Sequence, residues 1–243
     1  MERFPEYRWL DRQLEEAKML ARAATWRPIS PAQFLEVARD TNRRFVETPE
    51  QLMEAILGSL VRLQARLRDE LPAVKDLWNE AKGVFWPKDE QVLSTYVARH
   101  LRDDLSSRGI IVNREVQIRP GTGNRTGQLT DLHVDATIPG RSADSYERTS
   151  IVIEAKGNWH PELLTAMQTQ LRDRYLKDNP CKNGIYLVGW YSCDAWNKQD
   201  DSRKGRCPKM TLEEAREEFQ RQGAALSKDG YLIRATVLDL SLL

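Results

Sequence analysis

The chain has 243 residues, of which 40% are hydrophobic and 30% are charged, as in globular proteins with a substantial core. The longest apolar run, residues 185–191, is far shorter than the roughly 20 residues of a membrane-spanning helix. The first residues also lack the apolar segment of a signal peptide, so we expect a cytoplasmic protein without a membrane anchor. The formal net charge of +1 argues against binding of nucleic acid through an overall basic surplus, so phosphate contacts must come from a local patch.

Two further classes are disfavoured by missing motifs. The cysteines, Cys181, Cys193 and Cys207, are odd in number and widely spaced, and no C-x-x-C pair is present, which predicts free thiols and no zinc site. The phosphate-binding motif G-x-x-x-x-G-K-[ST] is also missing, so an ATPase acting with this protein must be a separate sensor or motor chain or domain.

Residues 1–84 have the pattern of helices, and we expect an all-helical N-terminal region that engages a partner or the substrate. Thr48-Pro49-Glu50-Gln51 fits a helix N-terminus with proline in the first turn. The apolar positions that follow recur every three or four residues, as in an amphipathic helix: Leu52, Ile56, Leu60, Leu63 and Leu67.

The pattern changes at Gly83-Val84-Phe85-Trp86-Pro87, where we place a domain boundary between residues 84 and 85. The elements expected beyond it are, in order, a helix over 88–107, strands over 110–118, 129–138 and 150–155 with a polar loop over 139–149, a helix from 161, a strand over 185–191, a surface loop over 192–209, a helix over 211–227 and a strand over 231–240. Three consecutive strands imply an antiparallel meander, and the later helical crossovers imply parallel or mixed neighbours. The sequence therefore predicts an α/β domain with a mixed sheet flanked by helices.

The residues with the clearest chemistry lie in the segment S-I-V-I-E-A-K-G, residues 150–157. Glu154 and Lys156 are two residues apart on the expected strand and so share a face. Asp131 lies on the preceding strand, and Asp135, four residues on, shares its parity and is the alternative first acid. Two carboxylates and one ammonium at a sheet end can hold a divalent cation and a water, which indicates phosphodiester hydrolysis.

The order of helix, strand, strand with Asp131, strand ending in Glu154-Ala155-Lys156, and helix with glutamines resembles the PD-(D/E)xK nuclease superfamily, which has the restriction-endonuclease-like fold. The resemblance covers about residues 86–243. It implies that Asp131, Glu154 and Lys156 are catalytic. The family's proline before the first acid is absent, but the glycine-containing turn that precedes Asp131 favours it over Asp135.

The same resemblance implies a Mg²⁺ or Mn²⁺ cofactor. Its ligands would be Asp131, Glu154 and the backbone carbonyl of Ala155, with Glu90 as an additional acid and Glu115 as a weaker candidate.

A glutamine-and-tyrosine helix is found in some branches of that superfamily. Gln170 and Tyr175 match it with one residue more between them, and Gln168 competes with Gln170 for the role. Positions near this helix are candidates for nucleic-acid binding: Trp159, His160, Arg172, Arg174 and Lys177. Trp159 can stack on a base and the basic side chains can contact phosphates, although His160-Pro161 also fits a plain helix entry.

The resemblance therefore implies a Mg²⁺-dependent deoxyribonuclease, with endonuclease favoured over exonuclease action. By analogy, we expect the effector part of a bacterial anti-phage defence system, with DNA as partner and a dimer as one possible state. The alternatives are a non-catalytic interaction module on the same fold and a structure-selective endonuclease of DNA junctions.

Overall fold

The computed structural model describes residues 8–25, 30–31, 46–69, 73–119, 128–139, 146–177 and 179–242. The chain divides into two compact units, Met1–Arg44 and Phe45–Leu243. The first contains helix α1 (Arg8–Thr25), whose side chains Leu10, Leu14 and Leu20 are exposed. Within the described ranges, no helix is both long enough and apolar enough to cross a membrane.

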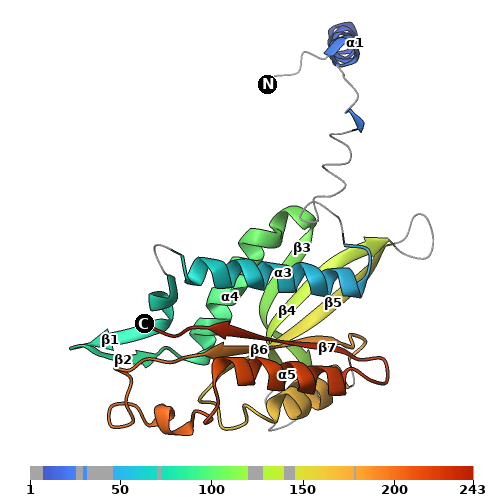
Figure 1. Ribbon diagram of the computed structural model, residues 1–243. Coiled ribbons are helices and arrows are strands. Elements are labelled where there is room, and N and C mark those ends of the chain that lie inside the picture. The colour runs from blue at the N-terminus through green and yellow to red at the C-terminus, as the bar shows by residue number, and fades with distance from the viewer. Residues whose placement is uncertain are drawn as a thin grey trace. The chain divides into compact units, whose positions relative to one another are not determined.

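The second unit is built on a five-stranded sheet in the order β3-β4-β5-β6-β7 (Figure 1). Its strands are β3 (Ile110–Arg119), β4 (Gln128–Pro139), β5 (Tyr146–Gly157), β6 (Asn183–Trp190) and β7 (Leu232–Asp239). The first three strands pair antiparallel, and β5, β6 and β7 pair parallel. The mixed sheet that the order of elements predicted is therefore confirmed, with the meander first and the parallel crossovers after it.

Helices cover both faces of this sheet. Helices α3 (Pro49–Leu67) and α4 (Glu90–Leu105), followed by the short η4 (Ser106–Arg108), pack on one face. The π-helix η5 (Met167–Leu176) and helix α5 (Leu212–Leu226) pack on the other, and Figure 1 shows α3 and α5 on opposite sides of the sheet.

The alternation of side chains along β5 assigns its two faces. Ile151, Ile153 and Ala155 are buried in the core under α3 and α4, whereas Val152 is buried in the core under η5 and α5. Because successive side chains of a strand point to opposite faces, Glu154 and Lys156 belong to the same face as Val152. Both charged side chains are therefore directed into the layer between the sheet and η5.

The predicted boundary between residues 84 and 85 is wrong, because the compact unit that contains the sheet begins at Phe45. The apolar stripe of α3 is fully buried in the core shared with α4 and the sheet, so this helix is part of the sheet domain. The region is also not all helical: a short helix η3 (Ala73–Leu77) leads into an antiparallel hairpin of β1 (Trp78–Ala81) and β2 (Val84–Pro87). Parts of residues 1–84 lie outside the described ranges.

Three smaller expectations are corrected. Strand β5 begins at Tyr146. Residues 146–149, which the polar sequence predicted as part of a loop, continue the pairing with β4. The segment after Pro161 forms turns before the π-helix. The stretch over 192–209 is more than a surface loop, since it contains the 3-10 helix η6 (Ser202–Arg206) and the buried Trp196.

Candidate active site

The predicted acid of β4 lies where β4 and β5 separate. The pairing of these strands ends at Leu132 opposite Ile153, beyond which β4 remains paired with β3 and β5 with β6. Asp131 is the next residue, and its Oδ2 accepts a hydrogen bond from the backbone N–H of Ala155 at 2.9 Å. The carboxylate thus satisfies a backbone donor at the fork, and this holds Asp131 beside the end of β5.

Glu154 and Lys156 form a buried ion pair at the same end of the sheet. Lys156 Nζ lies 2.6 Å from Glu154 Oε1, and the side chains are 9% and 2% exposed. The second carboxylate oxygen, Glu154 Oε2, is buried without a hydrogen-bond partner among the described residues. The Glu154 carboxyl can also form a side-chain hydrogen bond with Asp131, which lowers the pKa of Asp131. In the ionised form, an oxygen without a partner at such depth is costly, so it indicates a place where a cation supplies the missing contact.

Helix α4 adds a third acid from the other face of the sheet. Glu90, in the first turn of α4, accepts a hydrogen bond from the backbone N–H of Gly157 at 2.9 Å. Glu90 was predicted from the sequence only as an additional acid. In the structure its carboxylate contacts Gly157, the residue that follows Lys156. Three carboxylates and one ammonium, from β4, β5 and α4, therefore meet at one strand end.

Burial and mutual repulsion control the protonation of this cluster. Desolvation, followed by the charge of Asp131, raises the pKa of Glu154 to about 7, even though Lys156 opposes the shift. Burial likewise raises the pKa of Asp131 and of Glu90, which the N–H groups of Ala155 and Gly157 oppose. Burial alone would lower the pKa of Lys156, but the carboxylates around it outweigh burial, so the pKa is raised and the ammonium stays charged.

Two tyrosine side chains line the candidate site on the side that faces η5. Tyr186 is paired with Glu154 across the parallel β5–β6 ladder and donates its hydroxyl hydrogen to the carbonyl of Leu163 at 2.7 Å. Tyr175 is buried, and desolvation followed by the charge of Glu154 raises its pKa to about 12. These rings keep water from the carboxylates, which explains the desolvation at Glu154.

The π-helix accounts for the longer glutamine-to-tyrosine spacing. Since a π-helix bonds residue i to i+5, residues five apart lie one turn apart on the same side, as residues four apart do in an α-helix. The Gln170 amide donates a hydrogen bond to Glu162, whereas the exposed Gln168 has no described contact with the site. The structure thus brings Tyr175 to the acids and gives Gln170 a partner in the turn before the helix.

Asp135, the alternative first acid, is committed to a separate cluster. It accepts hydrogen bonds from Arg148 at 2.8 and 2.9 Å and from Ser150 at 2.6 Å, and lies 3.2 Å from His133. These partners outweigh burial and lower the pKa of Asp135 to about 2. The structure therefore places Asp131, and not Asp135, at the acid cluster, because Asp135 lies opposite Ser150 and Asp131 accepts a hydrogen bond from Ala155. The Glu115 side chain lies outside the described part of the structure.

The candidate nucleic-acid contacts are placed differently from one another. Trp159 is 5% exposed and packs edge-on against Tyr191, with ring centroids 4.7 Å apart, so it belongs to the core and cannot stack on a base as predicted. His160 is half-buried, and burial followed by the nearby Lys156 charge lowers its pKa, which places it close to the acid cluster.

The basic residues of η5 lie at the surface or partly so. The Arg172 guanidinium lies over the Tyr231 ring and 3.8 Å from Asp229, and the Arg174 guanidinium lies over the Tyr175 ring. Lys177, next to the helix end, is exposed. Of these three residues, Arg174 contacts a residue of the candidate site, because its guanidinium lies over the Tyr175 ring.

The side chains present fit a hard divalent cation, although no group of three or more acids, histidines or cysteines in the described ranges is preformed around one. Lys156 occupies one oxygen of Glu154, and Glu90 is engaged with Gly157. Asp131 and the unpartnered Glu154 Oε2 are nevertheless oxygen donors of the type that Mg²⁺ and Mn²⁺ prefer.

Two supporting residues carried no recognisable sequence signal. Asn158 bonds both backbone groups of Tyr191, at 3.0 and 3.2 Å, and so joins the end of β5 to the end of β6. Arg203 donates to the carbonyl of Pro87 at 2.7 Å and lies 3.4 Å from Asp89, next to Glu90. Both act through contacts that are distant in sequence, so spacing alone could not reveal them.

Comparison of the chain with protein-family models, with curated proteins and with solved structures finds no match.

Proposed function

We propose that this protein is a Mg²⁺-dependent deoxyribonuclease with a restriction-endonuclease-like fold and Asp131, Glu154 and Lys156 as its catalytic residues. The observation that carries the proposal is the buried Glu154–Lys156 pair beside Asp131, with Glu154 Oε2 lacking a partner. A cluster made only for stability rarely leaves a buried carboxylate oxygen unsatisfied, since each such group costs about 1–3 kcal/mol.

The residues divide the chemistry between them. Asp131, Glu154 and the Ala155 carbonyl would hold the cation, with Glu90 nearby. When bound, Mg²⁺ or Mn²⁺ would lower the pKa of a coordinated water and offset charge on the phosphate. The Lys156 ammonium, which stays charged because of its carboxylate neighbours, would orient the attacking water and attract the same phosphate.

The test is cleavage of supercoiled and linear DNA in Mg²⁺ or Mn²⁺ and in EDTA. We expect metal-dependent cutting by the native protein that falls by at least about a hundredfold in Lys156→Ala. The matched control is Lys75→Ala, since Lys75 is an exposed lysine in η3. Unchanged cutting by Lys156→Ala would contradict the site.

A non-catalytic interaction module and a junction-selective endonuclease are the other outcomes of the same test. Absence of cutting of any DNA or RNA in either metal would favour the module. Cutting confined to branched substrates would favour the junction enzyme, for which a dimer in solution is expected. The polar chemistry of the buried cluster favours a hydrolytic enzyme over the interaction module, and the branched substrates distinguish the junction enzyme from other deoxyribonucleases.

A further inference from the structure

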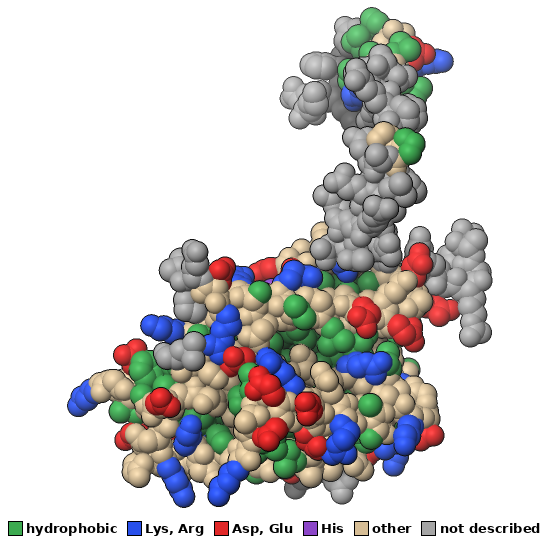
Figure 2. Space-filling view, viewed as in Figure 1, with side chains coloured by type: hydrophobic (Ala, Val, Ile, Leu, Met, Phe, Trp, Pro, Cys, Tyr) green, Lys and Arg blue, Asp and Glu red, His purple; other side chains and the backbone are tan. Residues whose placement is uncertain are grey.

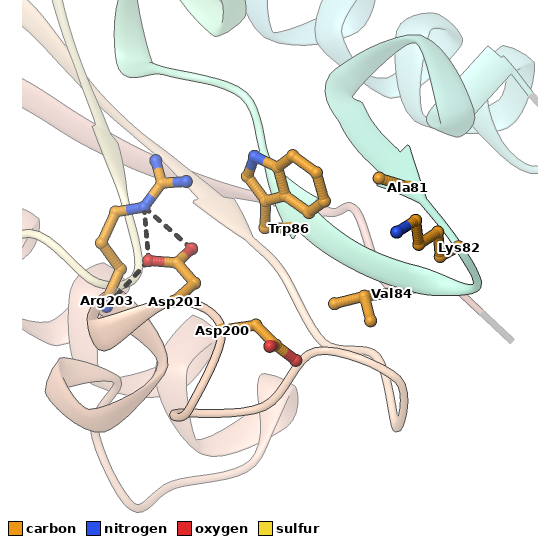
Figure 3. Close-up of a pocket in the computed structure, with 7 residues that line it drawn as sticks. All are labelled: Ala81, Lys82, Val84, Trp86, Asp200, Asp201 and Arg203. Carbon is orange, nitrogen blue, oxygen red and sulfur yellow. Dashed lines mark hydrogen bonds and ion pairs between the residues drawn. The ribbon is translucent and has the colours of Figure 1, made fainter.

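A pocket of about 480 Å³ lies between the β1–β2 hairpin and the segment around η6 (Figure 3). Its walls are Ala81, Lys82, Val84 and Trp86 from the hairpin, and Asp200, Asp201 and Arg203 from the η6 segment. Figure 3 shows the Trp86 indole between the Asp201–Arg203 pair and the hairpin turn. The size is within the range of small-ligand sites in proteins.

Two of the charged groups in the wall are structural. Asp201 accepts hydrogen bonds from the Arg203 side chain at 3.0 and 3.1 Å and from the indole N–H of Trp196 at 3.1 Å. Arg203 is further held by the carbonyl of Pro87. This pair shapes the wall of the pocket, and its charges offset each other.

The remaining polar groups are available to a ligand. Lys82 is exposed and makes no ion pair with any described residue, and Asp200 accepts a hydrogen bond from Asn197 through Oδ2, while its Oδ1 has no partner in the described ranges. Lys82 also has a φ of 53°, in a turn where asparagine or glycine is less strained. The pocket therefore offers one ammonium, one carboxylate oxygen and one indole ring over apolar side chains.

The surroundings favour an anionic ligand. Residues 198–209 contain two acids, Asp200 and Asp201, against five basic residues: Lys198, Arg203, Lys204, Arg206 and Lys209. Lysine and arginine side chains also project from this part of the surface in Figure 2. A cationic ligand would be repelled by Lys82, whereas a phosphate would be attracted to it.

The pocket is joined to the acid cluster through Arg203. Its guanidinium lies 5.1 Å from the ring centroid of Trp159, which follows Gly157 by two residues, and 3.4 Å from Asp89, which precedes Glu90. The Arg203 charge also opposes the raised pKa of Glu90, so a residue of the pocket wall lies near the acid cluster.

We propose that this pocket binds one unpaired nucleotide of the substrate strand, with the base stacked on Trp86, the phosphate at Lys82 and a base amino group donating to Asp200. The inference rests on the proposed nuclease function and adds a preference for single-stranded segments near the cut. Aromatic stacking suits any base, and a carboxylate accepts from the amino group of cytosine, which uracil lacks.

Binding is measured by fluorescence anisotropy of a labelled oligodeoxycytidine in EDTA, so that cutting does not intervene. We expect Trp86→Ala to weaken binding by roughly 5- to 150-fold, the range that loss of one stacked base represents, and Trp86→Phe to retain most of it. Thermal melting of both variants identifies any effect of misfolding, since Trp86 packs on the core.

Charge and base preference are tested with matched pairs. Lys82→Glu should weaken binding and reduce its salt dependence, whereas Lys75→Glu, the same change at an exposed lysine outside the pocket, should not. The native protein should bind oligodeoxycytidine more tightly than oligodeoxyuridine, and Asp200→Asn should remove that difference, because an amide can donate to uracil O4.

The inference would be overturned if folded Trp86→Ala bound the oligonucleotide with native affinity, or if Lys82→Glu and Lys75→Glu changed the affinity equally. Equal affinity of the native protein for dCMP and for the oligonucleotide would also overturn it, because it would indicate a site for free nucleotides. If the protein cuts DNA in a metal-dependent way and the Trp86 and Lys82 variants bind as the native protein does, the nucleotide pocket is contradicted and the nuclease function is supported. If binding depends on Trp86 and Lys82 but the protein cuts no nucleic acid, the nuclease function is contradicted and the pocket is supported.

Discussion

The carboxylate of Asp131 accepts a hydrogen bond from the backbone N–H of Ala155 at 2.9 Å, at the point where strand β4 leaves strand β5. This bond joins Asp131 to the backbone between Glu154 and Lys156, because Ala155 lies between those two residues. It also supports Asp131 as the proposed first acid, because the Ala155 N–H at the strand fork donates to this side chain.

The first prediction separates the two candidate acids. Asp131→Asn should lower metal-dependent cutting by more than about a hundredfold, since it removes a charged oxygen ligand, while the amide oxygen can still accept from Ala155. Asp135→Asn should keep most of the activity, because Asp135 is bound by Arg148 and Ser150. Initial cutting rates of both variants test this, and a reversed order would return Asp135 to the site.

The second prediction concerns how Glu154 makes the stability of the metal-free protein depend on pH. Its pKa is raised from 4.5 to about 7 in the folded protein, so folding favours its protonated form. This stabilisation is complete below the unfolded pKa and is lost as the pH rises through 7. The free energy of unfolding of the native protein in EDTA, relative to that of Glu154→Gln, should therefore fall by about 3 kcal/mol between pH 4 and pH 8.

Addition of Mg²⁺ provides the control for this prediction. A cation bound at the carboxylates stabilises the folded state by mass action, so it should raise the melting temperature of the native protein at pH 8 and leave Glu154→Gln nearly unchanged. An equal rise in both proteins would contradict a role for Glu154 as ligand.

The third prediction has the opposite sign and uses Asp135. Its pKa is lowered from 3.8 to about 2 in the folded protein by its hydrogen-bond partners, despite burial. The resulting stabilisation, about 2 kcal/mol, is complete above the unfolded pKa and is lost as the pH falls through 2. Urea unfolding should show Asp135→Asn less stable than the native protein at pH 7, with a gap that narrows below pH 4. A gap independent of pH would show that the carboxylate charge contributes little.

The fourth prediction tests the close packing at the end of β5. A methyl group on Gly157 would lie 2.5–2.7 Å from the Trp159 ring. The backbone N–H of Gly157 also donates a hydrogen bond to Glu90. Gly157→Ala should therefore destabilise the protein by about 1–3 kcal/mol and reduce cutting. Gly58→Ala is the matched control, since its methyl group would be 3.6 Å from the nearest atom, within helix α3. This change should stabilise by up to about 1 kcal/mol, so similar losses in both variants would contradict the argument.

Local sequence patterns predicted most of the sheet domain correctly. Thr48 accepts a hydrogen bond from the backbone N–H of Gln51 at 3.2 Å, as the motif Thr48-Pro49-Glu50-Gln51 predicted. The helix predicted over 211–227 begins with a capping box at Thr211 and Glu214, in which both hydrogen bonds are present. The antiparallel meander and the mixed character of the sheet followed from the succession of elements, because hairpin neighbours pair antiparallel and helical crossovers allow parallel pairs.

The misassigned helix α3 shows the limit of such patterns. Its amphipathic stripe indicated that the helix buries one face, but not against which partner. In the structure the stripe packs on α4 and the sheet, so the boundary moves from 84/85 to 44/45. Trp159 is similar: an aromatic after the E-x-K strand looks like a ligand contact, yet its ring fills the core against Tyr191.

For the candidate site, the sequence alone determined that Glu154 and Lys156 share a face at the end of an apolar strand, because strand periodicity is a local property of the backbone. Only the tertiary structure decided between Asp131 and Asp135, brought Glu90 to Gly157 and buried Glu154 beneath two tyrosines. These relationships depend on where two strands separate and where a helix begins relative to them. Register and packing between distant segments set both, and residue spacing within one segment does not encode them.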